Sequence, residues 1–192
     1  MYLYIIFFLF NIYDMIKAFK NFGKSIAVYH GLGSGPDPGR IEYLRSIGYV
    51  NIHYPRIDFE GEWYKDGCKS MFIRELRSIK EKEIDLLLGF SIGGYLAFEL
   101  AGKSSIDLVL VNPAIDRSKT RLDIKYFNIP NGRNFGKIET FLGSKDDLID
   151  RNIPINFLRK NNIKSDIHII DGMEHGTPPE YFVEIVNKSK LI

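Results

Sequence analysis

Short apolar runs alternate with amphipathic segments along most of this chain, beginning near Lys24. Several of these runs are apolar at every position and not only at alternate ones, which is typical of strands that are covered on both faces. Six runs are predicted as strands: SIAVYH (25–30), VNIHY (50–54), IDLLLGF (84–90), IDLVLVN (106–112), KIETFLG (137–143) and SDIHIID (165–171).

The segments between the runs have the spacing of amphipathic helices. Gly48 stands at the end of the first of them, where a glycine commonly terminates a helix. Regular alternation of strands and helices predicts an α/β fold, with a mostly parallel central sheet of about six strands and helices on both faces. The predicted helices cover residues 40–48, 62–82, 92–102, 155–160 and 179–188.

One domain accounts for most of the chain. Its 192 residues have the length of a single α/β domain, and no repeat, linker or low-complexity tract divides them. We expect residues 23–192 to form this domain. Residues 113–135 lack periodicity and predict a long loop over the sheet, of a kind that is more often functional than accidental.

The first thirteen residues, MYLYIIFFLFNIY, are apolar and uncharged. A helix of that length spans about 20 Å, which is short of the roughly 30 Å hydrocarbon core of a bilayer. The basic start and small-residue cleavage site of a signal peptide are also missing. We therefore interpret residues 1–22 as an apolar extension, either a peripheral helix or a stretch ahead of a functional start at Met15. We expect no stable membrane insertion.

Composition narrows the function classes. The chain is 45% hydrophobic and 26% charged, as in ordinary globular proteins, and its net charge is +2. Positive residues are interleaved with acidic ones, so no nucleic-acid partner is predicted. The single cysteine, Cys68, excludes an intrachain disulfide and a CxxC motif. It fits a reducing compartment, and we expect a cytoplasmic protein.

The segment GFSIG, residues 89–93, places a serine between a predicted strand and a predicted helix. In a G-x-S-x-G motif the serine occupies a sharp, strained turn that presents its hydroxyl above the sheet. Large side chains at the glycine positions would collide with the neighbouring elements, and the helix N-terminus adds partial positive charge. Ser91 is therefore predicted to be a nucleophile.

A serine nucleophile needs a base, and the chain has four histidines. His53 and His168 lie within predicted strands, where a packing or surface role is expected, and His30 ends the first strand. His175 lies in the loop DGMEHGTPP after the last strand, at the edge of a parallel sheet where active residues collect. His175 is the predicted base.

A carboxylate should orient that histidine from the loop after the preceding strand. The loop reads FLGSKDDLID, and Asp146 stands directly beyond the strand end. Asp147 and Asp150 remain alternatives, as does a role for these acids in capping the following segment. The order Ser91, Asp146, His175 along the chain is typical of hydrolases and not of the common serine proteases.

Attack on a carbonyl creates an oxyanion that needs two preorganised N–H donors. The backbone N–H of Ile92 is one predicted donor, and that of Leu32 is the other. Leu32 lies in the loop HGLGSGPDPG after the first strand, where Gly31 and Gly33 allow close backbone approach. We expect His30 to order this oxyanion loop without acting as the base.

The same glycines offer a rival interpretation as a dinucleotide-binding turn. Its third glycine, Gly35, comes one position early, and prolines follow where a helix should already run. Asp58 would be the acid that binds the ribose. The match is partial throughout, so no cofactor and no metal are predicted.

Five segments together resemble the α/β-hydrolase superfamily, and more narrowly the small YqiA-like bacterial esterases. They are HGLGSGP, GFSIGGYLAFELA, LVNPAI, LGSKDDLID and GMEHG, which run in order from about residue 25 to the end. The resemblance implies a minimal α/β-hydrolase fold. It also implies Ser91 as nucleophile, Asp146 as acid, His175 as base, an oxyanion loop at 30–33, and activity on short acyl esters and acyl-thioesters.

The predicted function is hydrolysis of carboxylic esters or thioesters through an acyl-serine intermediate, with a small ester or acyl-thioester as substrate. The 113–135 loop, Trp63 and Tyr64 are candidate pocket walls. Two alternatives stay open: a non-catalytic binding module on a hydrolase scaffold, and an amidase or acyltransferase that uses the same triad. The oligomeric state is open as well.

Overall fold

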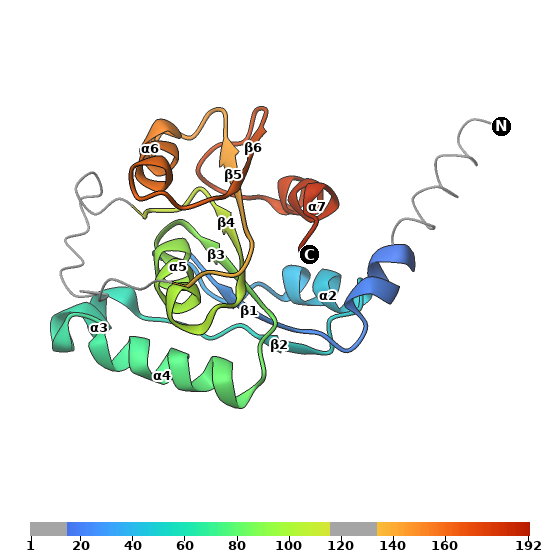
Figure 1. Ribbon diagram of the computed structural model, residues 1–192, viewed down its shortest axis with the longest axis horizontal. Coiled ribbons are helices and arrows are strands. Elements are labelled where there is room, and N and C mark those ends of the chain that lie inside the picture. The colour runs from blue at the N-terminus through green and yellow to red at the C-terminus, as the bar shows by residue number, and fades with distance from the viewer. Residues whose placement is uncertain (1–14, 116–133) are drawn as a thin grey trace.

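The computed structural model describes residues 15–115 and 134–192. One six-stranded sheet with the order β2-β1-β3-β4-β5-β6 forms its centre (Figure 1). All of its strand pairs are parallel, so the predicted α/β class with a parallel sheet is confirmed. The strands are β1 (Ser25–Tyr29), β2 (Asn51–His53), β3 (Leu86–Phe90), β4 (Asp107–Val111), β5 (Ile138–Gly143) and β6 (Asp166–Ile170).

Helices follow the strands as the alternation predicts, with one difference. The segment 62–82, predicted as a single helix, belongs to two helices, because Gly67 and Cys68 have φ angles of 65° and 67°. Two consecutive left-handed residues end a right-handed helix. The helices are α2 (Pro38–Ser46), α3 (Phe59–Asp66), α4 (Lys69–Glu81), α5 (Ser91–Ser104), α6 (Asn152–Lys160) and α7 (Pro179–Lys188).

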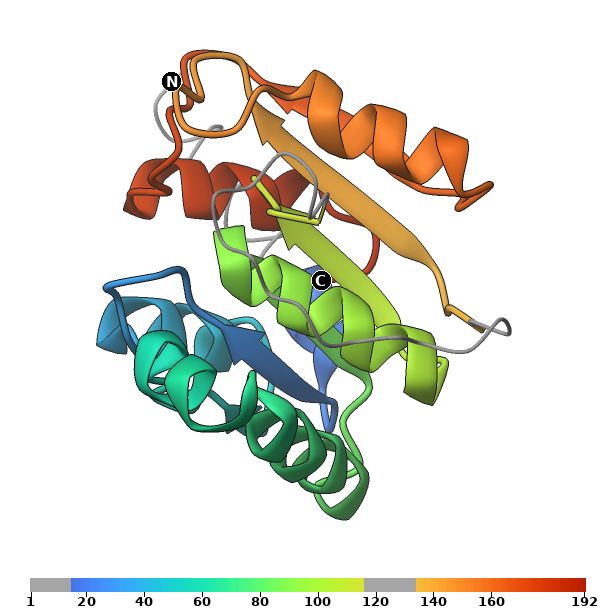
Figure 2. The same ribbon diagram turned by 90° about the vertical axis from the view of Figure 1, so that its left-hand side faces the viewer.

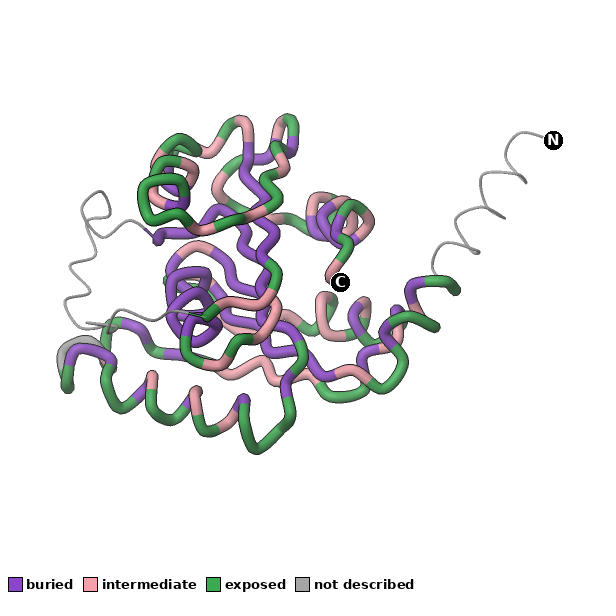
Figure 3. The backbone as a smooth tube through the Cα atoms, in the orientation of Figure 1, coloured by how far each residue is buried: buried purple, intermediate pink, exposed green. Residues whose placement is uncertain are grey.

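Helices cover both faces of the sheet (Figure 2). Ala27 and Tyr29 of β1 belong to the core cluster that includes residues of α4, α5 and α6. Ile26 and Val28 belong to the opposite cluster, which includes residues of α2 and α7. Successive side chains of a strand point to opposite faces, and both faces are buried here (Figure 3). This explains why the runs of inner strands such as β1 and β3 are apolar at nearly every position, whereas the edge strands β2 and β6 are partly exposed.

The start and end of α2 follow local chemistry. The Asp37 side chain accepts hydrogen bonds from the backbone N–H groups of Gly39 and Arg40, and Pro38 occupies the first turn. Beyond the end of the helix, Gly48 has a φ of 102°. A Cβ at Gly48 would also collide with the carbonyl of Ala18. Both the positive φ and the close approach of Ala18 therefore require a glycine at position 48.

Residues 15–21 are helical and pack on the domain. Lys17 is 6% exposed. Its Nζ donates to the carbonyl oxygens of Val186 and Ser189 at 2.6 and 2.8 Å, where α7 ends. This part of the predicted 1–22 extension is thus tied to the C-terminal region, whereas residues 1–14 lie outside the described residues. Among the helices of the described ranges, none is both long enough and apolar enough to cross a membrane.

The topology places two loops side by side. From β1 the chain crosses to β2 on one side, and from β3 it crosses to β4 on the other, although β1 and β3 are neighbours. Ligands of parallel α/β proteins bind at such a switch point, beyond the carboxyl ends of the strands. The 30–39 loop follows β1, and Ser91 follows β3.

Candidate active site

Ser91 occupies a strained turn between β3 and α5. It is the first residue of α5 and has a φ of 52°, in the left-handed region that side chains other than glycine rarely adopt. A Cβ on Gly93 would collide with the carbonyl oxygens of Tyr29 and His30. A Cβ on Gly89 would lie 2.6 Å from the carbonyl oxygen of Gly93. Both motif glycines therefore allow this close approach of helix and strands.

The hydroxyl of Ser91 faces a histidine. Its Oγ lies 2.9 Å from Nε2 of His175, from the turn that follows β6, 84 residues further along the chain. The serine is partly buried, and the histidine side chain is 19% exposed. The separation is a normal hydrogen-bond length, so a proton can pass directly from the hydroxyl to the imidazole.

The other ring nitrogen of His175 contacts Asp146. Nδ1 lies 3.0 Å from each carboxylate oxygen of Asp146, whose side chain is 2% exposed. Asp146 Oδ1 also accepts the backbone N–H groups of Leu148 and Ile149 at 3.0 and 2.9 Å, which fix the carboxylate. The neighbouring Asp147 is exposed, and no hydrogen bond joins it to His175 in the described structure.

Asn112, immediately after β4, holds the His175 turn over the ends of the strands. Its Nδ2 donates to the carbonyl oxygens of Glu174 and His175 at 2.9 and 3.2 Å, and its Oδ1 accepts the N–H of Gly143 at 2.7 Å. Asn112 is 2% exposed and has a φ of 43°. The sequence marked this residue only through the family resemblance of LVNPAI, and its positioning contacts were not predicted.

The His175 turn also packs tightly on the end of β5. A Cβ on Gly143 would collide with the carbonyl oxygen of Met173, which accepts the N–H of Lys145 at 3.0 Å. On the far side, Arg40 of α2 donates to the carbonyl oxygen of Thr177 at 2.5 Å. The histidine is therefore held by contacts from several elements, and its distance to Ser91 does not depend on its own loop alone.

The loop after β1 adjoins Ser91. A Cβ on Gly31 would lie 3.4 Å from Cβ of Ser91, so the backbone of this loop borders the hydroxyl. The N–H of Ile92 belongs to the first turn of α5, where N–H groups lack intrahelical acceptors. The close approach to Ser91 brings Gly31 of the predicted oxyanion loop next to the serine, while the placing of Leu32 and Gly33 at the oxyanion remains a prediction. The donor roles of Leu32 and Ile92 remain predictions.

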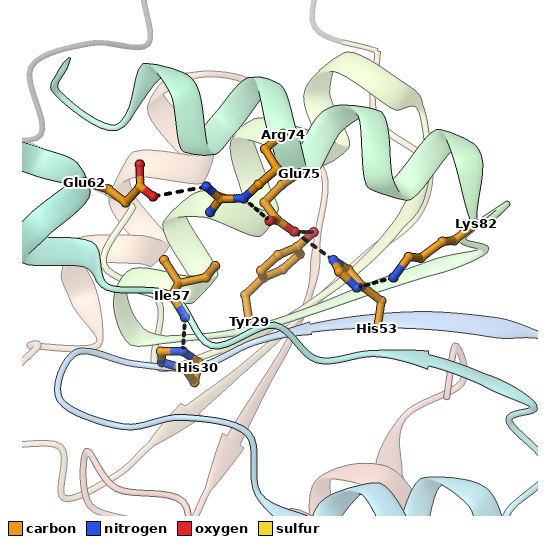
Figure 4. Close-up of polar contacts among 8 residues, drawn as sticks. All are labelled: Tyr29, His30, His53, Ile57, Glu62, Arg74, Glu75 and Lys82. Carbon is orange, nitrogen blue, oxygen red and sulfur yellow. Dashed lines mark hydrogen bonds and ion pairs between the residues drawn. The ribbon is translucent and has the colours of Figure 1, made fainter. Parts of the chain in front are cut away.

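His30 is buried beneath that loop, with 2% of its surface exposed. Its Nε2 accepts the backbone N–H of Ile57 at 2.9 Å (Figure 4), and its Nδ1 lies 2.8 Å from the carbonyl oxygen of Gly31. A nitrogen that accepts an N–H must carry a lone pair, so the ring is neutral and Nδ1 donates. Both ring nitrogens thus have backbone partners, one in the loop and one at Ile57, and the role of His30 in ordering an oxyanion loop stays a prediction.

The two remaining histidines have structural partners away from Ser91. His168 stacks on Phe141 with 4.6 Å between the ring centroids. His53 Nε2 lies 2.8 Å from Oε2 of Glu75, a carboxylate of α4 that is 2% exposed (Figure 4). Arg74 lies 3.2 Å from the other oxygen of Glu75. Burial alone would raise the pKa of Glu75, but the hydrogen bonds and charges of His53 and Arg74 bring it below its ordinary value.

The dinucleotide interpretation finds little support in the geometry. Asp58 Oδ1 accepts the N–H of Gly61 at 2.9 Å within the first turn of α3, which is a capping contact. Gly35 faces the guanidinium of Arg56, with 3.1 Å from its Cβ position to Nη2. Of the predicted pocket walls, residues 116–133 and the side chains of Trp63 and Tyr64 lie outside the described residues.

No family model matches this chain, and no curated protein matches its sequence. Solved structures do match. A protein from Xanthomonas campestris pv. campestris assigned to the alpha/beta hydrolase superfamily is 17% identical, with a TM-score of 0.61, over 85% of this chain and 94% of that one. A monoacylglycerol lipase from Paleococcus ferrophilus is 14% identical, with a TM-score of 0.61, over 87% and 95%.

A third match is a fluorophosphonate-binding serine hydrolase from Staphylococcus aureus. It is 14% identical, with a TM-score of 0.58, over 86% of this chain and 81% of that one. These similarities establish an α/β-hydrolase-like fold for the chain, as the sequence predicts. Sequence identities this low support a shared fold but do not identify a substrate.

Proposed function

We propose that this protein is a serine hydrolase that cleaves carboxylic esters or thioesters, with Ser91, His175 and Asp146 as its catalytic triad. The observation that carries the proposal is the 2.9 Å contact between Ser91 Oγ and His175 Nε2, with Asp146 on the opposite ring nitrogen at 3.0 Å. The hydrolase fold of the structural neighbours supports the same reaction class.

The first half-reaction forms an acyl-enzyme. Ser91 Oγ attacks the carbonyl carbon of the substrate while His175 Nε2 takes the hydroxyl proton. The negative oxygen of the tetrahedral intermediate accepts hydrogen bonds from the N–H groups of Leu32 and Ile92, each worth roughly 3–4 kcal/mol in the barrier. The carbon–oxygen or carbon–sulfur bond then breaks, and the leaving alcohol or thiol takes the proton from His175.

The second half-reaction releases the acid. Water gives a proton to His175 and its oxygen attacks the acyl carbon, and collapse of the second intermediate returns the proton to Ser91. Asp146 keeps the imidazole in the tautomer with a proton on Nδ1 and stabilises the imidazolium formed at each proton transfer. The buried carboxylate and its two backbone hydrogen bonds suit that role.

The finer assignment is to a YqiA-like esterase that acts on short acyl chains. Its support is the sequence resemblance of the segments around Ser91, Asn112 and His175. We place the protein in the cytoplasm as part of the same proposal.

The single thiol is held in its protonated, unreactive form. Burial raises the pKa of Cys68 to about 11, and the nearby charges of Glu62 and Asp66 contribute to the rise.

Hydrolysis of p-nitrophenyl acetate and butyrate tests the proposal. Wild type should release p-nitrophenol in a reaction that a fluorophosphonate abolishes, whereas Ser91→Ala should not turn over. Equal, slow hydrolysis by both proteins would contradict the proposal and leave the binding module as the better interpretation. Adding hydroxylamine or a competing alcohol, and analysing the products, separates a hydrolase from an acyltransferase, and p-nitroanilide analogues test for amidase activity.

A further inference from the structure

The helix at residues 15–21 presents an apolar face to solvent. Met15 and Ile16 are 67% and 62% exposed, and Phe19 and Phe22 are 89% and 81% exposed. Met15, Ile16 and Phe19 lie on one side of this helix, because Phe19 follows Met15 by four residues and Ile16 by three, and Phe22 lies in the turn directly after the helix. We call these four residues the apolar face. Two exposed phenylalanines and two exposed aliphatic side chains gathered in this way are unusual on a soluble surface.

The opposite side of this helix is fixed to the domain. Lys17 and Asn21 are 6% and 0% exposed, and Lys17 donates to carbonyl groups at the end of α7. Ala18 packs against Gly48. Because buried polar contacts hold this side, the helix cannot rotate to bury its phenylalanines without breaking them. The apolar face is therefore held outward by the fold.

Lys20 follows Phe19 in the helix, and Lys24, Lys137 and Lys190 lie near Lys20; we call these four lysines the basic rim. Lys20, Lys137 and Lys190 are exposed, and Lys24 is half-buried. Lys20 Nζ donates to the carbonyl of Lys190. Burial lowers the pKa of Lys20, and the charges of Lys24 and Lys137 lower it further, against an opposing effect of Glu139. The like charges are thus close enough to interact.

The nearby acidic groups are already engaged. Glu139 is 3% exposed and accepts from the Ser189 hydroxyl at 2.5 Å and from the Lys190 N–H at 3.0 Å. Asp166 lies 3.5 Å from Lys190. These two carboxylates and three lysines, Lys137, Lys164 and Lys190, are the charged residues that line a cleft of about 500 Å³. Three lysines against two carboxylates give this lining a net charge of +1, and Lys20 and Lys24 add positive charge beside it.

We infer that the apolar face and the basic rim dock the protein onto the surface of an anionic lipid bilayer, without spanning it. Apolar side chains flanked by lysines are the composition of interfacial helices, with the apolar groups in the acyl boundary and the lysines among the headgroups. The thirteen residues that begin the chain are uncharged and mostly apolar, which continues this character in the sequence. A second copy is a poorer occupant, because a two-fold contact would bring the lysines of both copies together.

Docking in this way would leave the candidate active site accessible. Lys24 precedes β1 and Lys137 precedes β5, so the basic rim lies at the amino ends of the strands. Ser91 lies beyond the carboxyl end of β3. The two surfaces are at opposite edges of one parallel sheet. Docking on a bilayer therefore does not depend on the proposed hydrolase activity.

Sedimentation with vesicles tests the inference on the full chain. Vesicles of phosphatidylcholine alone are compared with vesicles in which about a third of the lipid is phosphatidylserine, at low and high salt. The protein should sediment with the anionic vesicles and dissociate as salt rises. Phe19→Ser with Phe22→Ser, and separately Lys20→Glu with Lys137→Glu, should each lower the partition coefficient at least about tenfold.

Matched controls separate docking from general effects. Ile73→Ser changes an exposed apolar residue of α4, and Lys69→Glu with Lys80→Glu reverses two exposed charges of the same helix, and both should bind as wild type. All variants should keep the thermal midpoint of wild type, since the changed side chains are exposed. Absence of binding to anionic vesicles would overturn the inference. So would equal binding by the phenylalanine variant, or ultracentrifugation showing a dimer that this variant dissociates.

Discussion

The side-chain amide of Asn112 donates to the carbonyl oxygen of His175 at 3.2 Å, across 63 residues of chain. The same side chain accepts the N–H of Gly143 at the end of β5. One buried residue thus joins the ends of two strands to the turn that carries the candidate base. The position of that base relative to Ser91 is consequently a property of the whole carboxyl edge of the sheet.

Replacing Asn112 by glycine should lower turnover with little change in KM. Glycine adopts the φ of 43° without strain, so the substitution removes only the side-chain hydrogen bonds. A His175 turn that shifts by about an ångström should cost roughly 10- to 100-fold in kcat. Asn162→Gly is the matched control, since Asn162 is exposed and has a φ of 53°. Equal kcat values for the two variants would remove Asn112 from the account.

Asp146 and Asp147 are adjacent in sequence but differ in what they contact. Asp146→Asn should lower kcat by about three to four orders of magnitude, because an amide cannot hold His175 in the required tautomer. Asp147→Asn should change kcat by less than about twofold, in line with small effects of exposed sites. Steady-state kinetics on one p-nitrophenyl ester compares them, and the reverse order would assign the acid to Asp147.

Gly93 should be irreplaceable for stability. A Cβ there meets two backbone carbonyl oxygens, which cannot move aside without displacing β1, so Gly93→Ala should cost about 3 kcal/mol or more in unfolding free energy. Gly176→Ala provides the comparison, because nothing lies within 4 Å of its Cβ position. Urea denaturation measures both. Coincident unfolding midpoints would mean that the turn holding Ser91 is looser than described.

The buried carboxylate of Glu75 gives stability a pH dependence. Its pKa is lower in the folded protein than the ordinary value of 4.5, because His53 and Arg74 outweigh the effect of burial. Its contribution is therefore complete above that value and is lost as pH falls through the lower folded pKa.

Glu75→Gln should destabilise by about 2 kcal/mol near neutral pH, because the amide carries no negative charge and offers one acceptor oxygen where the carboxylate offers two, to His53 and Arg74. That difference from wild type should shrink as pH falls below the ordinary value of 4.5 and the wild-type carboxylate also becomes protonated. The exposed Glu81→Gln, on the same helix, should follow wild type throughout. A constant difference across the range, measured by chemical denaturation, would show that Glu75 does not titrate with folding.

Much of the fold follows from local sequence. The ends of the predicted strands lie within two residues of the observed ends. Strands covered on both faces leave continuous apolar segments in the sequence, and polar turns interrupt these segments. The break between α3 and α4 cannot be predicted from the apolar pattern of the sequence. It depends on the left-handed φ of Cys68, while the apolar spacing of Met71 and Ile79 continues a helical pattern across that region.

Some residues of the candidate site can also be predicted from local sequence, and others cannot. Ser91, Asp146 and His175 are identifiable because each follows a strand whose order in a parallel sheet is constrained. The contacts of Asn112 and the anchoring of Lys17 are not predictable locally, since each joins residues from distant parts of the chain. Their sequence neighbourhoods carry no periodic or motif signal of those partners.

The central claim is that Ser91 becomes covalently acylated during turnover. It is tested by reacting the protein briefly with a fluorophosphonate, or with p-nitrophenyl butyrate under acid quench, and locating the adduct by peptide mass spectrometry. We predict one adduct on the peptide containing Ser91, which disappears in Ser91→Ala and forms far more slowly in His175→Ala. An adduct on another residue, or an unmodified Ser91 in protein that still hydrolyses the ester, would contradict the account.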